Sequence, residues 1–266
     1  MTEDLKSTVQ TTDVDGQQQS PTLTYGSLFS GIGGFDLGLD RVGMTCSWQV
    51  EIDPFCRSVL ARHWPDVPRF EDIKEFDATA RPVDLVCGGF PCQDISRVGK
   101  RVGLAEGAKS GLWSEMHRVI GEARPRYVLV ENSTSINHHG LDIVLADLAS
   151  LGFDAEWDCL PASAFGAPHI RDRFYLLAYA RDGRPRTSDE TVFAGWTSSQ
   201  LHGGWSLEPA VGRVVDGVPR GMDGPRRARI GALGNAVVPR IVEWLGGLIV
   251  ADAAAQREQE DDVNAA

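Results

Sequence analysis

The segment Asp84-Leu-Val-Cys-Gly-Gly-Phe-Pro-Cys-Gln-Asp-Ile-Ser96 begins as an apolar run and ends in polar residues. The apolar, partly β-branched residues from Val83 to Val86 predict a buried strand. Two glycines end that strand, and Pro91, which has no N–H to donate, pushes Phe90 towards extended geometry. Because open α/β folds carry their chemistry just past the carboxyl ends of strands, Cys92 is the candidate nucleophile.

The composition sets limits on the class of protein. The chain has 266 residues, 42% of them hydrophobic, which is enough for one large domain or one domain with a small second one. No apolar run reaches the length of a transmembrane helix, and the polar residues 1–20 do not resemble a signal peptide. The five cysteines are odd in number and form no Cys-x-x-Cys pair, so we expect a reducing, cytoplasmic setting without a disulfide framework or a metal site.

The formal net charge of −11 is unusual for a protein that binds nucleic acid. Residues 1–20 hold four acids against one lysine, and residues 251–266 hold five acids against one arginine. These two ends therefore account for −7 of the −11, and we expect 1–20 and 252–266 to be disordered, solvated tails. The charge that remains leaves room for a local basic cleft.

A glycine-rich turn, Ser30-Gly-Ile-Gly-Gly34, follows a first predicted strand over Leu23–Phe29. Glycines at such a turn let the backbone approach a ligand at the start of a helix. The next predicted strand, Thr45–Val50, ends in Glu51, 20 residues after Gly31. That spacing is typical of the acid that binds ribose hydroxyls, although it does not distinguish NAD from another adenosine cofactor, and a simple tight turn is the alternative.

Hydrophobic periodicity predicts the other elements. Asp53 is expected to cap a helix that starts at Pro54, because proline suits the first helical position. Helices are expected at 35–41, 54–63, 111–123, 141–151 and 240–251, and strands at 70–73, 126–130, 153–160 and in the segment that ends at 178. Strands that alternate with helices predict an α/β fold with a mostly parallel sheet.

Acidic residues follow two of these strands. Glu131 and Asn132 end the strand at 126–130, and a catalytic role is favoured over a helix cap because Cys92 follows a neighbouring strand. Asp72 could accept a hydrogen bond from an adenine amino group while Ile73 packs on the ring. Taken alone, Asp72 is better explained as a turn residue.

Basic residues gather in three later segments. The expected loop from Asp94 to Lys109 carries four bases against two acids, which suits a polyanion, although an ordinary solvated loop is the alternative. Arg171 and Arg173 are two residues apart and should share one face of an extended segment, where they could contact phosphates or base edges. Residues 181–229 are rich in Gly, Pro, Ser and Arg and predict a small irregular lobe or a loop-rich insert.

Together these motifs resemble the DNA (cytosine-5)-methyltransferase family over roughly residues 24–250. Phe29-Ser-Gly-Ile-Gly-Gly34 is similar to its first cofactor motif, and Gly234-Asn-Ala-Val-Val-Pro239 is similar to its last motif, which returns to the cofactor pocket. The resemblance implies a class I methyltransferase core with S-adenosylmethionine as the cofactor. The implied cofactor contacts are Phe29, Gly31, Gly33, Gly34, Glu51, Asp72, Ile73, Asn235, Ala236 and Val237.

Three further motifs of the family concern the chemistry. Gly89-Phe-Pro-Cys-Gln93 resembles the catalytic motif, Glu131-Asn132 the acidic motif, and His169-Ile-Arg-Asp-Arg173 the Gln-x-Arg-x-Arg motif. The resemblance implies that Cys92 attacks C6 of a flipped-out cytosine, with the two glycines before it leaving room for that base and the loop 94–109 closing over it. The implied partners in this step are Glu131 at N3, Arg173 at O2, Arg171 on the loop or a phosphate, and Pro91, Gln93, Ser96 and Asn132 as substrate contacts.

The resemblance also implies a division of the chain and a partner. Residues 21–179 and 229–251 would form the catalytic domain, and residues 180–228 would form a small target-recognition region. The substrate would be double-stranded DNA. The enzyme would be monomeric and encoded by a bacterium or a phage, either as part of a restriction-modification system or outside one. The sequence departs from the family at His169, at Ser133 and in the short recognition region. An RNA cytosine methyltransferase and a non-catalytic DNA-binding homologue are the alternatives. A nicotinamide dehydrogenase explains the glycine turn but not Pro-Cys-Gln.

Overall fold

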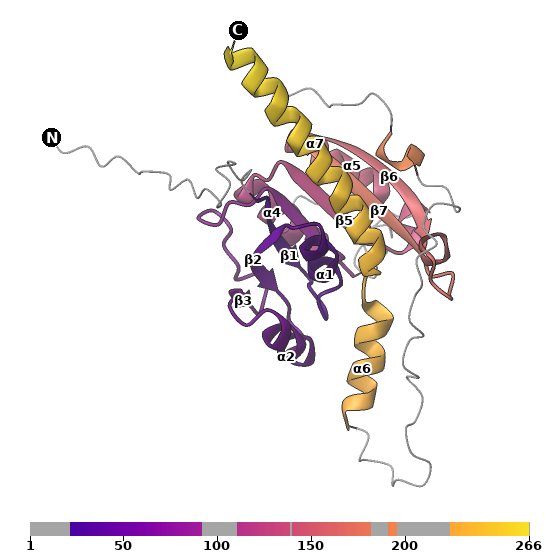
Figure 1. The fold of residues 1–266 in the computed structure, drawn as a ribbon. Coiled ribbons are helices and arrows are strands. Elements are labelled where there is room, and N and C mark those ends of the chain that lie inside the picture. The colour runs from indigo at the N-terminus through magenta and orange to yellow at the C-terminus, as the bar shows by residue number, and fades with distance from the viewer. Residues whose placement is uncertain (1–21, 92–110, 139, 182–190, 196–223, 266) are drawn as a thin grey trace, which may run out of the picture.

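The structure is a computed structural model that describes residues 22–91, 111–138, 140–181, 191–195 and 224–265. The described residues form a seven-stranded sheet with the order β3-β2-β1-β4-β5-β7-β6 (Figure 1). Strands from β3 to β5 pair in parallel, whereas β7 runs antiparallel to β5 and β6. The strands are β1 (Thr24–Leu28), β2 (Thr45–Val50), β3 (Arg69–Phe70), β4 (Leu85–Gly88), β5 (Tyr127–Asn132), β6 (Phe153–Pro161) and β7 (Asp172–Ala180). This architecture confirms the predicted mostly parallel sheet.

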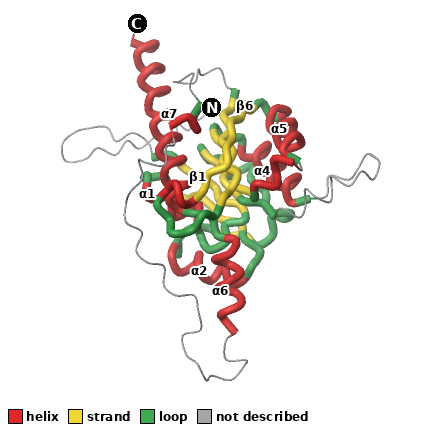
Figure 2. Tube along the Cα trace, turned by 90° about the vertical axis from the view of Figure 1, so that its right-hand side faces the viewer, coloured by secondary structure: helices red, strands yellow, loops and turns green. Residues whose placement is uncertain are grey.

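Helices cover both faces of the sheet (Figure 2). One face packs against α1 and α7, and the opposite face packs against α4 and α5, because alternate side chains of the central strands point in opposite directions. The α-helices are α1 (Gly34–Arg41), α2 (Pro54–His63), α4 (Leu112–Ala123), α5 (Leu141–Ser150), α6 (Gly224–Asn235) and α7 (Pro239–Ala265), and three 3-10 turns are η1 (Thr134–His138), η2 (Ala162–Phe165) and η3 (Val192–Gly195). None of the helices in the described ranges combines the length and the apolar character needed to cross a membrane.

The start of α2 confirms the predicted cap. The Asp53 carboxylate accepts hydrogen bonds from the backbone N–H groups of Phe55 and Cys56 at 2.8 and 3.0 Å, and Pro54 occupies the first helical position. The cap satisfies donors that lack partners inside the helix. It therefore fixes where the chain turns after Glu51, at the end of β2.

The acidic segment at the C-terminal end, which was predicted to be disordered, is helical. α7 continues to Ala265, so the expectation that residues 252–266 are disordered was wrong for 252–265. Tyr127 donates to the Asp252 carboxylate at 2.9 Å, and Arg126 donates to Gln256 at 2.7 Å. These contacts anchor the segment to the sheet. The segment is also rich in the good helix formers Ala, Gln and Glu, so it forms a helix despite the repulsion among its acidic side chains. The boundary expected after residue 228 falls inside α6.

A buried carboxylate joins α1 to the first two strands. Asp36 has no exposed surface, and its carboxylate accepts hydrogen bonds from Gln49 at 2.7 Å and Ser27 at 3.2 Å. Burial away from water disfavours the charged form and raises the pKa of Asp36 to about 6. Ionisation of the buried Asp36 at neutral pH therefore lowers the free energy of unfolding.

We expect Asp36→Asn to remove this destabilisation. Between the pKa of an ordinary aspartate, 3.8, and the folded pKa of about 6, the folded protein binds more protons than the unfolded chain, so Asp36 lowers stability as the pH rises. From about pH 4 to pH 7, the unfolding free energy of the variant should gain about 2 kcal/mol relative to that of the unaltered protein. Urea unfolding at both pH values measures the difference, and a difference that does not change with pH would contradict the prediction.

Candidate functional site

The glycine turn and Glu51 form one hydrogen-bonded unit at the carboxyl ends of β1 and β2. The backbone N–H of Gly31 donates to one Glu51 carboxylate oxygen at 2.7 Å, and the N–H of Asp53 donates to the other at 2.7 Å. Both Gly31 and Gly33 have positive φ, at 57° and 87°, which glycine adopts without strain. Each carboxylate oxygen keeps a second lone pair, so the held Glu51 can still accept from a ligand hydroxyl.

The last predicted motif lies directly against this turn. A Cβ atom at Gly34 would come within 2.7 Å of the Val237 carbonyl oxygen, so the two backbones touch. The structure thus brings together Gly33 and Gly34 with Ala236 and Val237, which are more than 200 residues away along the chain. They share a pocket of about 520 Å³, lined by Ile32, Gly33, Gly34, Leu37, His169, Arg171, Leu233, Ala236, Val237, Val238 and Pro239. Asn235 is the exposed last residue of α6 beside them.

We expect Gly34→Ala to weaken binding of the cofactor that the sequence predicts by about tenfold, because the new methyl group would collide with the backbone of the last motif and push it away from the turn. Titration with S-adenosylhomocysteine measures the affinity. Gly247→Ala is the matched control, because no atom lies within 4 Å of its added Cβ. That variant should bind as tightly as the unaltered protein and melt slightly higher, since alanine favours the helix. Equal affinities for all three proteins would contradict the prediction.

Asp72 and Ile73 lie in the turn that follows β3. Glu51 N donates to Phe70 O at 3.0 Å, which places this turn beside Glu51 at the same edge of the sheet. The Asp72 carboxylate accepts from the Lys74 N–H at 3.0 Å, as expected of a turn aspartate. Ile73 is only 4% exposed and packs mostly into the α4/α5 side of the core. An adenine contact therefore stays a prediction for both residues.

Glu131 lies next to the segment that leads to Cys92. β4 and β5 are paired neighbours, and a Cβ at Gly89 would meet a Glu131 carboxylate oxygen at 2.8 Å. The absent side chain of Gly89 therefore makes room for Glu131, and that of Gly88 makes room for Leu28. Room for a flipped base beside these glycines stays a prediction. The last residue described before the gap is Pro91. The predicted site residues Cys92, Gln93 and Ser96 and the loop 94–109 lie outside the described residues.

Asn132 holds the same segment from the other side. Its side-chain amide donates to the Phe90 carbonyl at 2.9 Å, and its carbonyl oxygen accepts from the Ser133 N–H at 2.8 Å. The Phe90 ring packs on Trp113 of α4 with the ring centres 5.2 Å apart. These contacts fix the backbone one residue before Pro91. A substrate contact by Asn132, which is almost fully buried, stays a prediction.

The two arginines of the His169–Arg173 motif separate. Arg173 lies in β7 and pairs with Glu131, with Nε 3.3 Å from Oε1. Arg171 precedes β7 with a positive φ of 31°, so the chain is not extended there and the expectation of one shared face was wrong. The Arg171 guanidinium donates to the carbonyls of Gly234 and Ala236 at 2.8 and 2.6 Å. Arg171 therefore ties the last motif to the site. Its contact with the loop 94–109 or with a phosphate stays a prediction, because that loop lies outside the described residues.

Burial dominates the electrostatics of Glu131. Glu131 is only 8% exposed. Its removal from water raises the pKa of the carboxyl to about 7, although the positive charges of Arg173 and Arg171 act in the opposite direction. Near neutral pH the group can therefore be either carboxylic acid or carboxylate. A carboxyl poised in this way is suited to hand a proton to a substrate and take it back.

Sequence reasoning missed Arg118 of α4, which contacts the turn after Asp72. Its only local signal was the position of two glutamates three residues before and four residues after it, a pattern common on solvated helix faces. Within the described ranges, no cluster of three or more His, Cys, Asp or Glu side chains is placed to hold a metal ion.

Comparison with known proteins gives a consistent set of relatives. The family profile for the C-5 cytosine-specific DNA methylase matches residues 23–202. A Type II methyltransferase of Bacillus subtilis strain 168 is 32% identical over 209 residues, which are 68% of this chain and 53% of that protein. The Type II methyltransferase M.MspI of a Moraxella species is 34% identical over 165 residues, 60% of this chain and 39% of that protein.

A solved structure shares the fold. A proposed DNA modification methyltransferase encoded within an E. coli prophage aligns with a TM-score of 0.52 at 26% identity, over 63% of this chain and 49% of that chain. The chain thus spans about half the length of the relatives that it matches.

Proposed function

Because the chain belongs to the C-5 cytosine-specific DNA methylase family, we propose that it transfers a methyl group from S-adenosylmethionine to C5 of cytosine in double-stranded DNA. The observation that carries this proposal is the buried carboxyl of Glu131, with its pKa raised to about 7, against Gly89 in the segment that runs to Cys92. The Type II methyltransferases among the relatives support DNA as the substrate.

The cofactor fits the residues that are present. A turn with two glycines at positive φ opens α1, Glu51 offers lone pairs beside it, and a pocket of about 520 Å³ lies between the turn and the last motif. Glu51, Asp72 and Ile73 do not line this pocket, so their contacts with the ribose and the adenine are part of the proposal. When bound, S-adenosylmethionine supplies an electrophilic methyl group on a sulfonium.

The chemistry of cytosine assigns the roles of the side chains. C5 is a weak nucleophile, so the Cys92 thiolate first forms a bond to C6, and the electrons of the C5–C6 double bond shift into the ring. N3 takes a proton from Glu131, which neutralises the ring and leaves C5 as an enamine-like carbon that can accept the methyl group. Arg173, which already holds Glu131, would contact the neighbouring O2 and stabilise the same charge.

The adduct must then be resolved. Loss of the C5 proton to a water molecule returns electrons to the C5–C6 bond, and the bond between C6 and sulfur breaks with release of the thiolate. Glu131 takes back the N3 proton in this step, so that the site returns to its starting state. The target base must leave the duplex first, because C6 is otherwise stacked.

A transfer assay tests the proposed function. Labelled S-adenosylmethionine is incubated with the protein and either duplex DNA or tRNA, and the nucleosides are separated. We expect label in 5-methylcytosine from duplex DNA. Label from tRNA alone would establish the RNA enzyme instead, and no transfer by folded protein to several DNAs of varied sequence would refute both. Methylation-aware sequencing of DNA from expressing cells then identifies the target sequence.

A further inference from the structure

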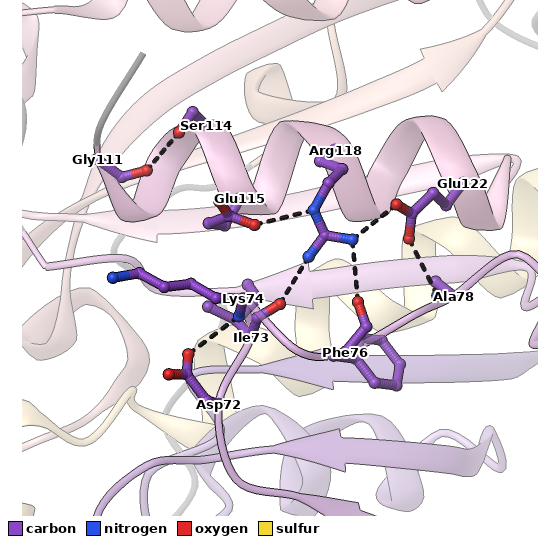
Figure 3. Close-up of polar contacts among 10 residues, drawn as sticks. All are labelled: Asp72, Ile73, Lys74, Phe76, Ala78, Gly111, Ser114, Glu115, Arg118 and Glu122. Carbon is purple, nitrogen blue, oxygen red and sulfur yellow. Dashed lines mark hydrogen bonds and ion pairs between the residues drawn. The ribbon is translucent and has the colours of Figure 1, made fainter. Parts of the chain in front are cut away.

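Arg118 lies in the middle of α4, outside every motif described above, yet it contacts the turn that carries Asp72 and Ile73 (Figure 3). One terminal nitrogen of its guanidinium donates to the Ile73 carbonyl at 2.6 Å, and the other donates to the Phe76 carbonyl at 2.9 Å. The planar guanidinium therefore grips two carbonyls three residues apart. A point charge such as lysine cannot reproduce that geometry.

Two glutamates orient the guanidinium. Glu115 accepts from Nε at 2.9 Å and Glu122 accepts from a terminal nitrogen at 2.6 Å, so carboxylates on both sides fix the direction in which the remaining N–H groups point (Figure 3). The second oxygen of Glu122 accepts from the backbone N–H of Ala78 at 3.0 Å. The helix thus holds the segment 73–78 at three backbone positions, each by a charge-assisted hydrogen bond.

The segment itself, which the structure describes throughout, contains no helix or strand, and its side chains Ile73 and Phe76 are buried in the core. It consists of tight turns, in which Glu75 N donates to Asp72 O at 3.1 Å and Phe76 N donates to Ile73 O at 3.3 Å. By contrast, α4 is firmly seated on the sheet through the fully buried Met116 and Val119. Arg118 therefore fixes the backbone next to Asp72 relative to α4.

We propose that Arg118 is a positioning residue for the adenine end of the cofactor site. By holding the Ile73 carbonyl, it would fix the position of the turn from which Asp72 and Ile73 are predicted to contact the adenine ring and its 6-amino group. This inference rests on the proposed function, because it assigns Arg118 to the binding of that cofactor. Arg118 touches neither the reacting atoms nor the methyl group.

Arg118→Met tests the inference, because methionine keeps much of the apolar stem and removes every donor. We expect its Kd for S-adenosylhomocysteine to rise about tenfold, which corresponds to about 1.4 kcal/mol. The KM for S-adenosylmethionine should rise in parallel, while kcat at saturating cofactor and the KM for DNA stay within about twofold. The matched control is Arg41→Met, which breaks the exposed Arg41–Glu243 pair at the other face and should leave every value unchanged.

A second readout separates positioning from general loosening. S-inosylhomocysteine carries an oxo group in place of the adenine 6-amino group, so the ratio of its Kd to that of S-adenosylhomocysteine reports how well the turn recognises that edge. The ratio should fall in Arg118→Met and in Arg118→Lys. An equal loss of affinity for both ligands would overturn the inference, and so would full recovery in the lysine variant.

The outcomes distinguish this inference from the proposed function. If the unaltered protein binds S-adenosylhomocysteine and folded Arg118→Met binds it equally well, the inference fails and the function stands. If the unaltered protein neither binds this ligand nor transfers methyl groups, the function itself fails. Should Arg118→Met not fold, Glu122→Gln keeps the arginine but cannot accept from both Arg118 and Ala78, and an unchanged inosyl-to-adenosyl ratio in that variant overturns the inference.

Discussion

Cys92→Ser is expected to abolish methyl transfer and to leave cofactor binding intact. The thiolate must add to C6 before C5 can attack, and a serine hydroxyl at neutral pH supplies almost no anion for that step. We therefore expect the transfer rate to fall by about a thousandfold or more. The affinity for S-adenosylhomocysteine should not change, because the turn at Gly31, Glu51 and the last motif lie on other segments of the chain.

The covalent step gives this prediction a direct readout. Duplex DNA with 5-fluorocytosine blocks the release of the adduct, because fluorine cannot leave C5 as a cation. The unaltered protein should form a denaturant-resistant complex with this DNA in the presence of S-adenosylmethionine, and Cys92→Ser should form none. Cys159→Ser replaces a half-buried cysteine of β6 and serves as the control that keeps both transfer and trapping. Trapping by the Cys92 variant would show that another nucleophile acts.

Elements with strong local signals were predicted almost to the residue. β2 matches the predicted strand at 45–50, and α2 starts at Pro54 and ends at His63 as expected, because Asp53 and Pro54 specify the cap through contacts within a few residues. The acidic helical extension was missed for the opposite reason. Its anchors, Tyr127 and Arg126, lie more than 120 residues away in sequence, and composition alone pointed to disorder.

The site shows the same division between local and distant information. Motif spacing identified Gly31 with Glu51, and the structure joins them by a hydrogen bond of 2.7 Å. The spacing of Arg171 and Arg173 predicted that they share one face, but Arg171 has a positive φ and its guanidinium binds the last motif. Arg118 had no motif at all. Its contact with Ile73 depends on how α4 packs beside the turn after β3, which no local pattern encodes.

Glu131→Gln is expected to lower the rate of methyl transfer by about a hundredfold or more, within the usual range for loss of a general acid. Glutamine keeps the size of the side chain and can donate a hydrogen bond to N3, but it cannot transfer a proton. The pKa of Glu131, raised to about 7 by burial, means that the acid form needed for donation is lost as the pH rises through about 7. The Cys92 thiolate has the opposite requirement, because it forms as the pH rises.

These opposed requirements predict a bell-shaped pH profile for the single-turnover rate at saturating cofactor, with a descending limb near pH 7 that belongs to Glu131. In Glu131→Gln that limb should disappear, so that the residual rate only rises with pH. Glu243→Gln makes the same acid-to-amide change at an exposed ion pair on α7 and should leave both the rate and the profile unaltered. A Glu131→Gln profile that keeps its descending limb would assign the limb to another group and remove Glu131 from proton transfer.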